Sequence, residues 1–374
     1  MNAPFALRRR PTAPAEQGAI DARYAALARE ERLLPVKVTP FYRRKIEAEV
    51  AALGHVEGPL HRGAYPSAER LAVRAPGEVR DWVDDRDNMP ATSSGAIVQK
   101  YPDRVLFMPT STCAGHCQYC FRQDVLSDWH ARGAGALDAA VAELLAHLDE
   151  RPEVREVILS GGDPMTLPTP LLARVLEPLH ARPGITRLRI HTRTIAFAPS
   201  AFASADKLEL LARTGVRLVF HLVHPYELCD AVRDAIRRVR AAGIRCYNQF
   251  PLLRRVNDHP ELLARHVEAL DELEVRTLSV FVPEPITGSA AFRLSFDRLE
   301  RLHDAFCRTT PSWIHATRFV LDTPIGKVRR EDVVGRDRAA GTIAFARDGR
   351  TVTYPDLPAE RDEPGELGTL LWRG

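Results

Sequence analysis

From residue 105 onward the chain alternates short apolar runs with longer amphipathic stretches. The apolar or β-branched runs predict strands at residues 105–108, 157–159, 188–190, 218–222, 246–250 and 278–282. The amphipathic stretches predict helices at residues 137–148, 169–179, 205–212, 228–242 and 260–273. Alternation of strand and helix indicates βαβ units that build a parallel sheet. The sequence therefore predicts an α/β fold, with two units too few for a closed eightfold barrel.

The remaining segments give weaker signals. Residues 16–52 have helical spacing that is interrupted at Pro35 and Pro40, whereas residues 58–92 show no period and predict an irregular segment around the sheet edge. The first residues are basic and rich in Pro and Ala, without the apolar region of a secretory signal, and predict a disordered tail. A further strand-like run covers residues 317–321.

Composition excludes several classes of partner. The net charge of +3 gives no argument for nucleic acid or for an acidic membrane surface. No apolar run approaches the ~18 residues that span a bilayer. Because clustered cysteines indicate a reducing compartment, we expect a soluble cytoplasmic protein that binds neither nucleic acid nor membranes.

Three of the six cysteines lie in one loop directly after the first predicted strand. Cys113, Cys117 and Cys120 have the spacing C-x₃-C-x₂-C. Thiolates hold iron–sulfur clusters, normally four to a cluster, so three would leave one iron of a [4Fe–4S] cube open to another ligand. Tyr119 and Phe121 beside the last cysteine would shield such a cluster from water. The alternative is a structural zinc ion with His116 or His130 as fourth ligand, although zinc sites usually use paired ligands.

Lysine is rare in this chain. Of the 52 basic residues only five are Lys, namely Lys37, Lys45, Lys100, Lys207 and Lys327. Unlike arginine, lysine can lose its proton and form a Schiff base. A lysine kept in such a chain is therefore a candidate for amine chemistry, and Lys327 follows a glycine just after a strand-like run.

The three-cysteine motif followed by an aromatic residue resembles the radical S-adenosylmethionine superfamily. Within it, YPDRVLF before the motif, CFR, SGGD, HP, NQ-x₃-LR-x-VND and a late Gly-Lys pair resemble the lysine 2,3-aminomutase family, over residues 38–327. This resemblance implies a partial (β/α)6 TIM-like barrel of the radical SAM type. It divides the chain into a disordered tail (1–15), an N-terminal helical and irregular region (16–100), the barrel (101–322) and a C-terminal extension with the cofactor lysine (323–374).

The resemblance also implies cofactor sites. Cys113, Cys117 and Cys120 would bind a [4Fe–4S] cluster whose open iron is chelated by S-adenosylmethionine. The loop after the second strand would contact the cofactor's amino group, and polar residues that end later strands would lie near it; these residues are Ser160, Gly161, Gly162, Asp163, His221 and Gln249.

A second set of residues matches the family's positions for pyridoxal 5′-phosphate and substrate. Lys327 would bind pyridoxal phosphate covalently, and Tyr101 and Arg104 would hold its phosphate, a task suited to arginine geometry. The substrate carboxylate would bind Arg122, and its distal ammonium would bind the acids Glu284 and Asp322. The chain departs from the family pattern in three places: the interval from Asp322 to Lys327 is short, Glu replaces the usual Asp at 284, and the C-terminal zinc-binding cysteines are absent.

The resemblance thus implies an isomerase that moves the α-amino group of a basic amino acid to the β-carbon, most simply L-lysine to β-lysine. The partners would be a free amino acid and an electron donor such as flavodoxin or ferredoxin; a homo-oligomer stays open, because the zinc cysteines that support it are missing. Alternatives are the same reaction on arginine or ornithine, and a radical enzyme without pyridoxal phosphate. A non-enzymatic electron carrier or zinc-stabilised module is a more distant alternative, against which the long α/β chain with its polar rim weighs.

Overall fold

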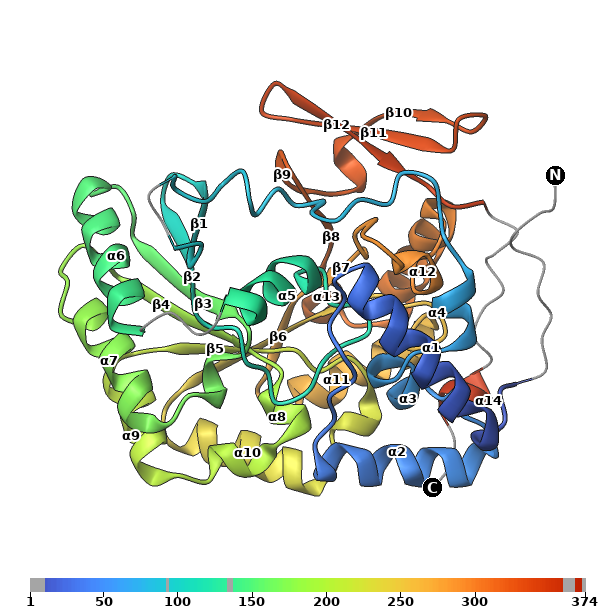
Figure 1. Cartoon of the computed structure of the whole chain (residues 1–374), viewed down its shortest axis with the longest axis horizontal. Helices are drawn as coiled ribbons and strands as arrows, with labels where there is room; N and C mark the ends of the chain where they lie inside the picture. The colour runs from blue at the N-terminus through green and yellow to red at the C-terminus, as the bar shows by residue number, and fades with distance from the viewer. Residues whose placement is uncertain (1–10, 92–93, 133–136, 359–366, 372–374) are drawn as a thin grey trace.

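The computed structural model describes residues 11–91, 94–132, 137–358 and 367–371, and its centre is a curved nine-stranded sheet (Figure 1). Strands β2 to β8 run parallel in chain order, and β1 and β9 pair antiparallel with the two ends of this set. The strands are β1 Ile97–Tyr101, β2 Arg104–Thr110, β3 Glu156–Gly161, β4 Arg187–Thr192, β5 Arg217–Phe220, β6 Arg245–Pro251, β7 Arg276–Phe281, β8 Arg318–Thr323 and β9 Gly326–Val328.

The predicted partial barrel is confirmed and extended by one strand. The six predicted strands correspond to β2 to β7, and the strand-like run 317–321 becomes β8, a seventh parallel strand. Helices connect these strands: α5 Gln123–Arg132, α6 Leu137–Glu150, α7 Thr169–His180, α8 Thr194–Phe197, α9 Ala205–Arg213, α10 Asp230–Ala241, α11 Pro260–Asp271, α12 Phe296–Thr309 and α13 Ser312–His315. All five predicted helices are present. Helix α12 was not predicted, although its buried Phe296, Leu299, Leu302 and Phe306 follow helical spacing.

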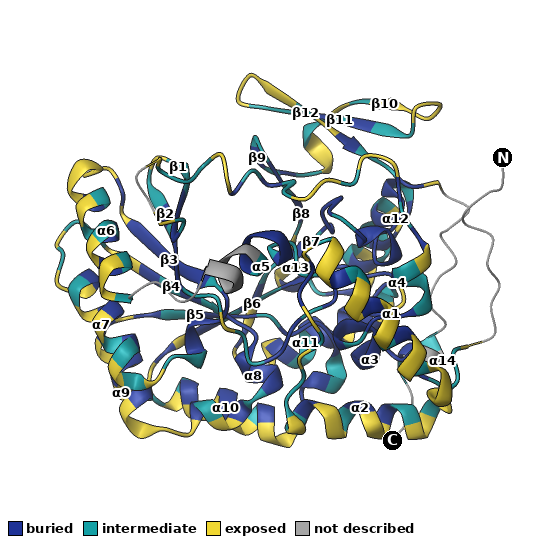
Figure 2. Cartoon of the chain, in the orientation of Figure 1, coloured by how far each residue is buried: buried dark blue, intermediate teal, exposed yellow. Residues whose placement is uncertain are grey.

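The main hydrophobic core lies between the sheet and the helices that cover its outer face. On β3, Val157 and Leu159 are fully buried in this core together with leucines of α7. Side chains alternate along a strand, so Glu156 and Ser160 point to the opposite face, into the barrel. Figure 2 shows the buried strands inside and the exposed residues on the outer surfaces of the helices. The inner face of the sheet is therefore free to carry polar side chains.

The N-terminal region is more ordered than the sequence indicated. Helices α1 Gln17–Glu30 and α2 Pro40–Leu53 confirm the predicted helical stretch, and Pro40 starts α2 with Thr39 as its N-cap. Two short helices, α3 Pro59–Ala64 and α4 Ala68–Ala72, interrupt the segment predicted as irregular. Of the predicted disordered tail, residues 1–10 lie outside the described part, while residues 14–16 form a 3₁₀ turn.

Two predicted domain boundaries fall inside strands of the structure. The boundary at residues 100 and 101 falls inside β1, and the boundary at residues 322 and 323 falls inside β8. The last residues of both strands are charged or polar and do not continue an apolar strand pattern. Beyond β9, a separate three-stranded antiparallel sheet follows, made of β10 Val333–Asp337, β11 Thr342–Arg347 and β12 Arg350–Pro355, and the last described helix is α14 Leu367–Leu370.

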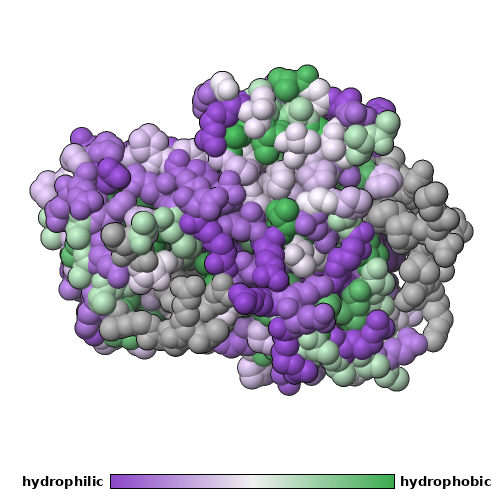
Figure 3. Space-filling model, turned by 45° about the horizontal axis from the view of Figure 1, so that its top comes forward, coloured by the Kyte–Doolittle hydropathy of each residue, from purple (hydrophilic) through white to green (hydrophobic). Residues whose placement is uncertain are grey.

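The C-terminal sheet projects beside the β8–β9 end of the barrel (Figure 1). It packs there through Ile343, Phe345 and Tyr354, which are almost fully buried. Figure 3 shows a surface that is mostly hydrophilic, with hydrophobic residues gathered on the projecting lobe at the top. Among the residues that the structure describes, no helix has both the length and the apolar character needed to cross a membrane.

Candidate active site

The cysteine loop connects β2 to α5 and packs tightly against its surroundings. A side chain at Gly115 would come within 2.5 Å of the Phe197 ring, and one at Gly162 would come within 2.5 Å of the Thr112 carbonyl oxygen. Lys37 donates a hydrogen bond to the Cys113 carbonyl at 2.7 Å, which ties the loop to the N-terminal region. The two glycines thus allow the cysteine loop to lie directly on the ends of neighbouring strands.

The three predicted cluster ligands lie on one loop. Burial raises the pKa of Cys113, and Asp163, Cys120 and Cys117 raise it further. The Cys120 amide donates to the Cys117 carbonyl at 3.3 Å, which turns the loop between these two cysteines. Tyr119 stacks on His221 with ring centroids 5.9 Å apart and contacts Phe292 edge-on. This partly buried group of thiols beside aromatic rings fits a [4Fe–4S] cluster, in which each thiolate binds its own iron.

The zinc alternative would need His116 or His130 as its fourth ligand. Among the described residues, no three side chains of Cys, His, Asp or Glu could hold one metal ion. The Nδ1 atom of His116 donates to the Pro35 carbonyl at 2.7 Å instead. The side chain of His130 lies outside the described part of the chain.

The SGGD loop after β3 positions the start of α8. One carboxylate oxygen of Asp163 accepts hydrogen bonds from Thr192 Oγ1 and from the Arg193 and Thr194 amides at 2.7–2.9 Å, and the other accepts from the Met165 amide. Protein donors therefore occupy both oxygens of the Asp163 carboxylate. The contact of this loop with the cofactor remains a prediction, and the loop backbone would make it. Gly161 has φ +91, a conformation that L side chains rarely adopt.

Arg122 is held in place by a residue that the sequence did not reveal. Its Nε donates to Asp85 Oδ2 at 2.6 Å and its Nη1 to Ser160 Oγ at 3.2 Å, and both charged side chains are almost buried. Burial alone lowers the pKa of Arg122, but Asp85 reverses this effect and holds the pKa above its usual value. Asp85 lies in the irregular segment, where no periodic pattern marks a residue as inward-facing.

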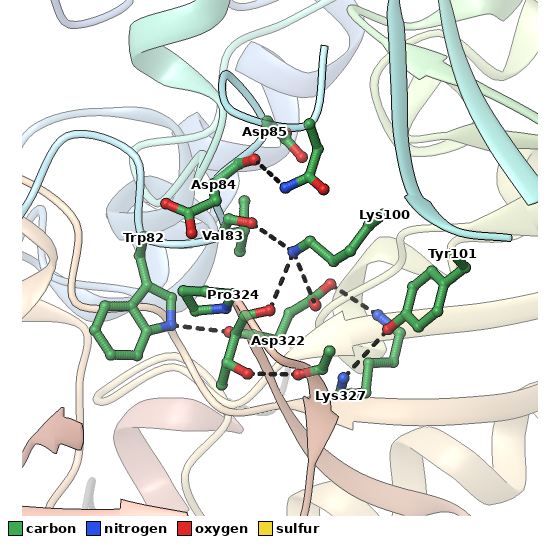
Figure 4. A network of polar contacts seen from close by, with 12 residues as sticks. Trp82, Val83, Asp84, Asp85, Lys100, Tyr101, Asp322, Pro324 and Lys327 are labelled. Carbon is green, nitrogen blue, oxygen red and sulfur yellow. Dashed lines mark hydrogen bonds and ion pairs between the residues drawn. The ribbon is translucent and has the colours of Figure 1, made fainter. Parts of the chain in front are cut away.

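Lys327 lies on the β8–β9 hairpin, directly opposite Asp322 (Figure 4). Its Nζ is 2.8 Å from Asp322 Oδ2 and 4.6 Å from the centre of the Phe281 ring. The Lys327 amide donates to the Tyr101 hydroxyl at 3.3 Å, which links the two edge strands β9 and β1. The short interval from Asp322 to Lys327 is thus a tight hairpin that places the amine beside the acid.

Lys100 is a second cation at this hairpin. Its ammonium donates to the carbonyl oxygens of Val83 and of Thr323 (3.0 Å), and lies 3.9 Å from Asp322 Oδ1 (Figure 4). Burial raises the pKa of Asp322, but Lys327 and Lys100 outweigh burial and bring the pKa below its ordinary value. The rarity of lysine was the only sequence signal for Lys100.

Glu284 follows β7 and is 9% exposed. Burial, with a contribution from Asp322, raises the pKa of its carboxyl to about 7, and Lys327 and Arg122 oppose that rise. The structure thus brings together five predicted residues, which we call the mouth cluster: Arg122, Ser160, Glu284, Asp322 and Lys327.

Tyr101 connects the mouth cluster to Arg104. The Arg104 guanidinium lies 4.7 Å from the centre of the Tyr101 ring, whose hydroxyl accepts from the Lys327 amide. Arg104 also pairs with the partly exposed Asp103 at 2.8 Å. Pyridoxal phosphate needs a lysine for its aldehyde and a cation for its phosphate. Lys327, whose amide contacts the Tyr101 hydroxyl, and Arg104, whose guanidinium lies over the Tyr101 ring, offer these two groups around one tyrosine.

The remaining predicted residues lie on the inner face of the barrel. The Nε2 atom of His221 is buried without a hydrogen-bond partner among the described residues. Gln249 Nε2 lies 3.2 Å from Nδ1 of His191, a residue that the sequence analysis did not select. Arg193, which directly follows β4, is not available to bind a ligand through an unpaired charge, because it pairs with the buried Glu227 at 2.7 Å.

Comparison with known proteins shows the family of the chain. Residues 107–267 match the radical SAM superfamily. The chain is 31% identical to L-lysine 2,3-aminomutase of Escherichia coli over 251 residues, which is 67% of this chain and 70% of that protein.

The chain belongs to the lysine 2,3-aminomutase family of radical SAM enzymes. It is also 30% identical to L-lysine 2,3-aminomutase of Haemophilus influenzae, over 60% of this chain and 64% of that protein. Glutamate 2,3-aminomutase of Clostridioides difficile is 26% identical, over 61% of this chain and 54% of that protein. Membership of this family, whose enzymes are isomerases, implies a [4Fe–4S] cluster, S-adenosylmethionine, a small-molecule substrate and a reductant.

Proposed function

We propose that this family member is a pyridoxal phosphate-dependent 2,3-aminomutase that acts on a basic amino acid, most simply converting L-lysine to β-lysine. The observation that carries this proposal is the mouth cluster, where one lysine amine, one guanidinium and two carboxyl groups meet beside the cysteine loop. When bound, the cluster and S-adenosylmethionine supply the radical that removes hydrogen from C3, and pyridoxal phosphate supplies the π bond through which nitrogen migrates.

The protein side chains bind and orient these groups. Cys113, Cys117 and Cys120 hold the cluster, and Lys327 holds pyridoxal phosphate. Arg122 binds the substrate carboxylate, and Asp85 orients its guanidinium through the 2.6 Å contact on Nε. A substrate fixed at its nitrogen and its carboxylate extends its side chain in one direction only, and we propose that this direction leads to Glu284 and Asp322.

Charge at the distal end supports a basic substrate. A carboxyl whose pKa is raised to about 7 by burial gains most from a cation that binds beside it. Lys100 would stabilise a bound acidic substrate less, because its ammonium already contacts two carbonyl oxygens and Asp322. An ammonium has three donors, so a substrate carboxylate would have to replace a protein contact.

The alternatives within this class are arginine and ornithine, which carry the same distal charge. A family member without pyridoxal phosphate would not need Lys327 beside Asp322 and Tyr101. The proposed electron donor is a flavodoxin or ferredoxin, in a cytoplasmic setting.

Turnover under reducing, anaerobic conditions tests this proposal. Wild-type protein reconstituted with iron, sulfide and both organic cofactors is given lysine, ornithine, arginine and glutamate separately. We expect a basic amino acid to be turned over fastest, and Asp322→Asn and Glu284→Gln to lower its kcat/KM. Preferred turnover of glutamate, or unchanged lysine turnover in both variants, would refute the distal-site assignment.

A further inference from the structure

His191 lies on β4 with its side chain on the inner face of the barrel. The neighbouring Ile190 is fully buried in the core outside the sheet, so alternation directs His191 inward. Its contact with Gln249 joins β4 to β6 across the intervening β5, which is possible only inside the curve of the sheet. His191 therefore faces the same interior as the mouth cluster.

The contact with Gln249 determines which ring nitrogen carries the proton. The amide nitrogen of Gln249 lies 3.2 Å from His191 Nδ1 and donates to it, so the ring proton is on Nε2. That Nε2 is buried and has no hydrogen-bond partner among the described residues. A buried donor without an acceptor is costly and calls for an explanation, such as a ligand that supplies the acceptor.

The imidazole of His191 is a neutral hydrogen-bond donor. Burial lowers the pKa of the ring most strongly, and Arg189, Arg122 and Lys327 lower it further, so the imidazole is neutral. The cations that act on it come from β4 itself, the cysteine loop and β9. Each of these cations is paired with an acid: Arg189 with Glu156, Arg122 with Asp85 and Lys327 with Asp322. A neutral N–H donates a hydrogen bond, and it forms a stronger bond with an ionised acceptor than with a neutral one, so an oxyanion suits the buried Nε2–H.

We propose that the Nε2–H of His191 binds an oxyanion of a ligand inside the barrel, either the phosphate of pyridoxal phosphate or the carboxylate of the amino acid. The identity of these two ligands rests on the proposed function, whereas the anion site itself rests on the geometry around His191. Gln249 then has a definite role, which is to hold the imidazole in the tautomer that donates.

The test compares wild type with His191→Phe, which removes the donor, and His191→Gln, which keeps an N–H at similar reach. His180→Phe, at the exposed end of α7, is the matched control. The affinities for pyridoxal phosphate and for pyridoxal are measured by absorbance titration, and KM for lysine is measured at saturating pyridoxal phosphate. Iron content and circular dichroism report folding, and His191→Ala repeats the comparison if the phenyl ring does not fit.

Loss of one hydrogen bond to a charged group predicts a change of about tenfold or more. Weaker binding of pyridoxal phosphate with unchanged pyridoxal binding would identify phosphate as the anion. A raised KM for lysine alone would identify the carboxylate. In both cases His191→Gln should recover most of the loss, and changes below about twofold in both quantities would overturn the proposal.

A titration with inorganic phosphate and with acetate separates this inference from the proposed function. If wild type binds neither pyridoxal phosphate nor an amino acid, the proposed function fails. Weaker binding of phosphate or acetate to His191→Phe than to wild type would still support the anion site. Equal binding to the two proteins would overturn it.

Discussion

Replacing Glu284 by Gln should stabilise the cofactor-free protein at alkaline pH and leave its stability in acid almost unchanged. Burial raises the pKa of this carboxyl from 4.5 to about 7 in the folded chain, whereas an unfolded chain restores the ordinary value. At about 1.36 kcal/mol for each pKa unit, the difference corresponds to an upper bound of about 3 kcal/mol. The free energy of unfolding should therefore change by up to that amount across the titration.

The sign follows from which state binds the proton. Below pH 4.5 the carboxyl is protonated in both states, so ionisation contributes nothing to stability. Between pH 4.5 and about 7 the unfolded chain loses the proton while the folded chain keeps it, so wild type loses stability as pH rises. Above about pH 7 the loss is complete and constant. Glutamine does not ionise, so the free energy of unfolding of the variant does not fall in this way.

Urea unfolding of both proteins at pH 4.5, 6 and 8 measures the effect. The difference in unfolding free energy between variant and wild type should rise by about 3 kcal/mol from the lowest to the highest pH. Glu30→Gln, on the exposed end of α1, is the control and should show no such rise. A difference for Glu284→Gln that is the same at every pH would refute the reasoning.

Three further predictions concern the cysteine loop and its support. Cys117→Ala should lose bound iron after anaerobic reconstitution, whereas Cys246→Ala, in the core on β6, should keep it; equal iron in both variants would contradict the cluster assignment. Asp163→Ala should lower the free energy of unfolding by about 3 kcal/mol, because several donors lose a charged acceptor, and an unchanged urea midpoint would disprove its positioning role. Asp85→Asn should raise KM for lysine about tenfold with unchanged iron content, since Arg122 loses its charged partner; an unaltered KM would exclude this orientation of Arg122.

Local patterns were sufficient to predict most of the barrel. Strands β2 to β7 were recognised because their outward-facing residues form apolar runs, as Val157 and Leu159 do on β3. The cysteine loop, the glycine pair at 161 and 162 and Lys327 were selected as candidate site residues because each lies in a short motif, and their roles stay predictions.

Contacts that depend on the path of the chain could not be predicted. Asp85 reaches Arg122 across 37 positions in sequence, and the segment that carries it has no repeating pattern. His191 stands one position from a buried isoleucine, and only the curvature of the sheet brings it to Gln249. The contact between Lys327 and Asp322 could not be predicted either, because it depends on the register in which β8 pairs with β9.

The most direct test of the account is reductive trapping of pyridoxal phosphate with borohydride, followed by peptide mapping. The chain has only five lysines, and Lys100 and Lys327 contact the same carboxylate, so the map distinguishes two adjacent amines. The account predicts a pyridoxyl adduct on Lys327 that is lost in Lys327→Ala, which should still bind iron. An adduct on Lys100, or no adduct in wild type that binds iron and cleaves S-adenosylmethionine, would contradict it.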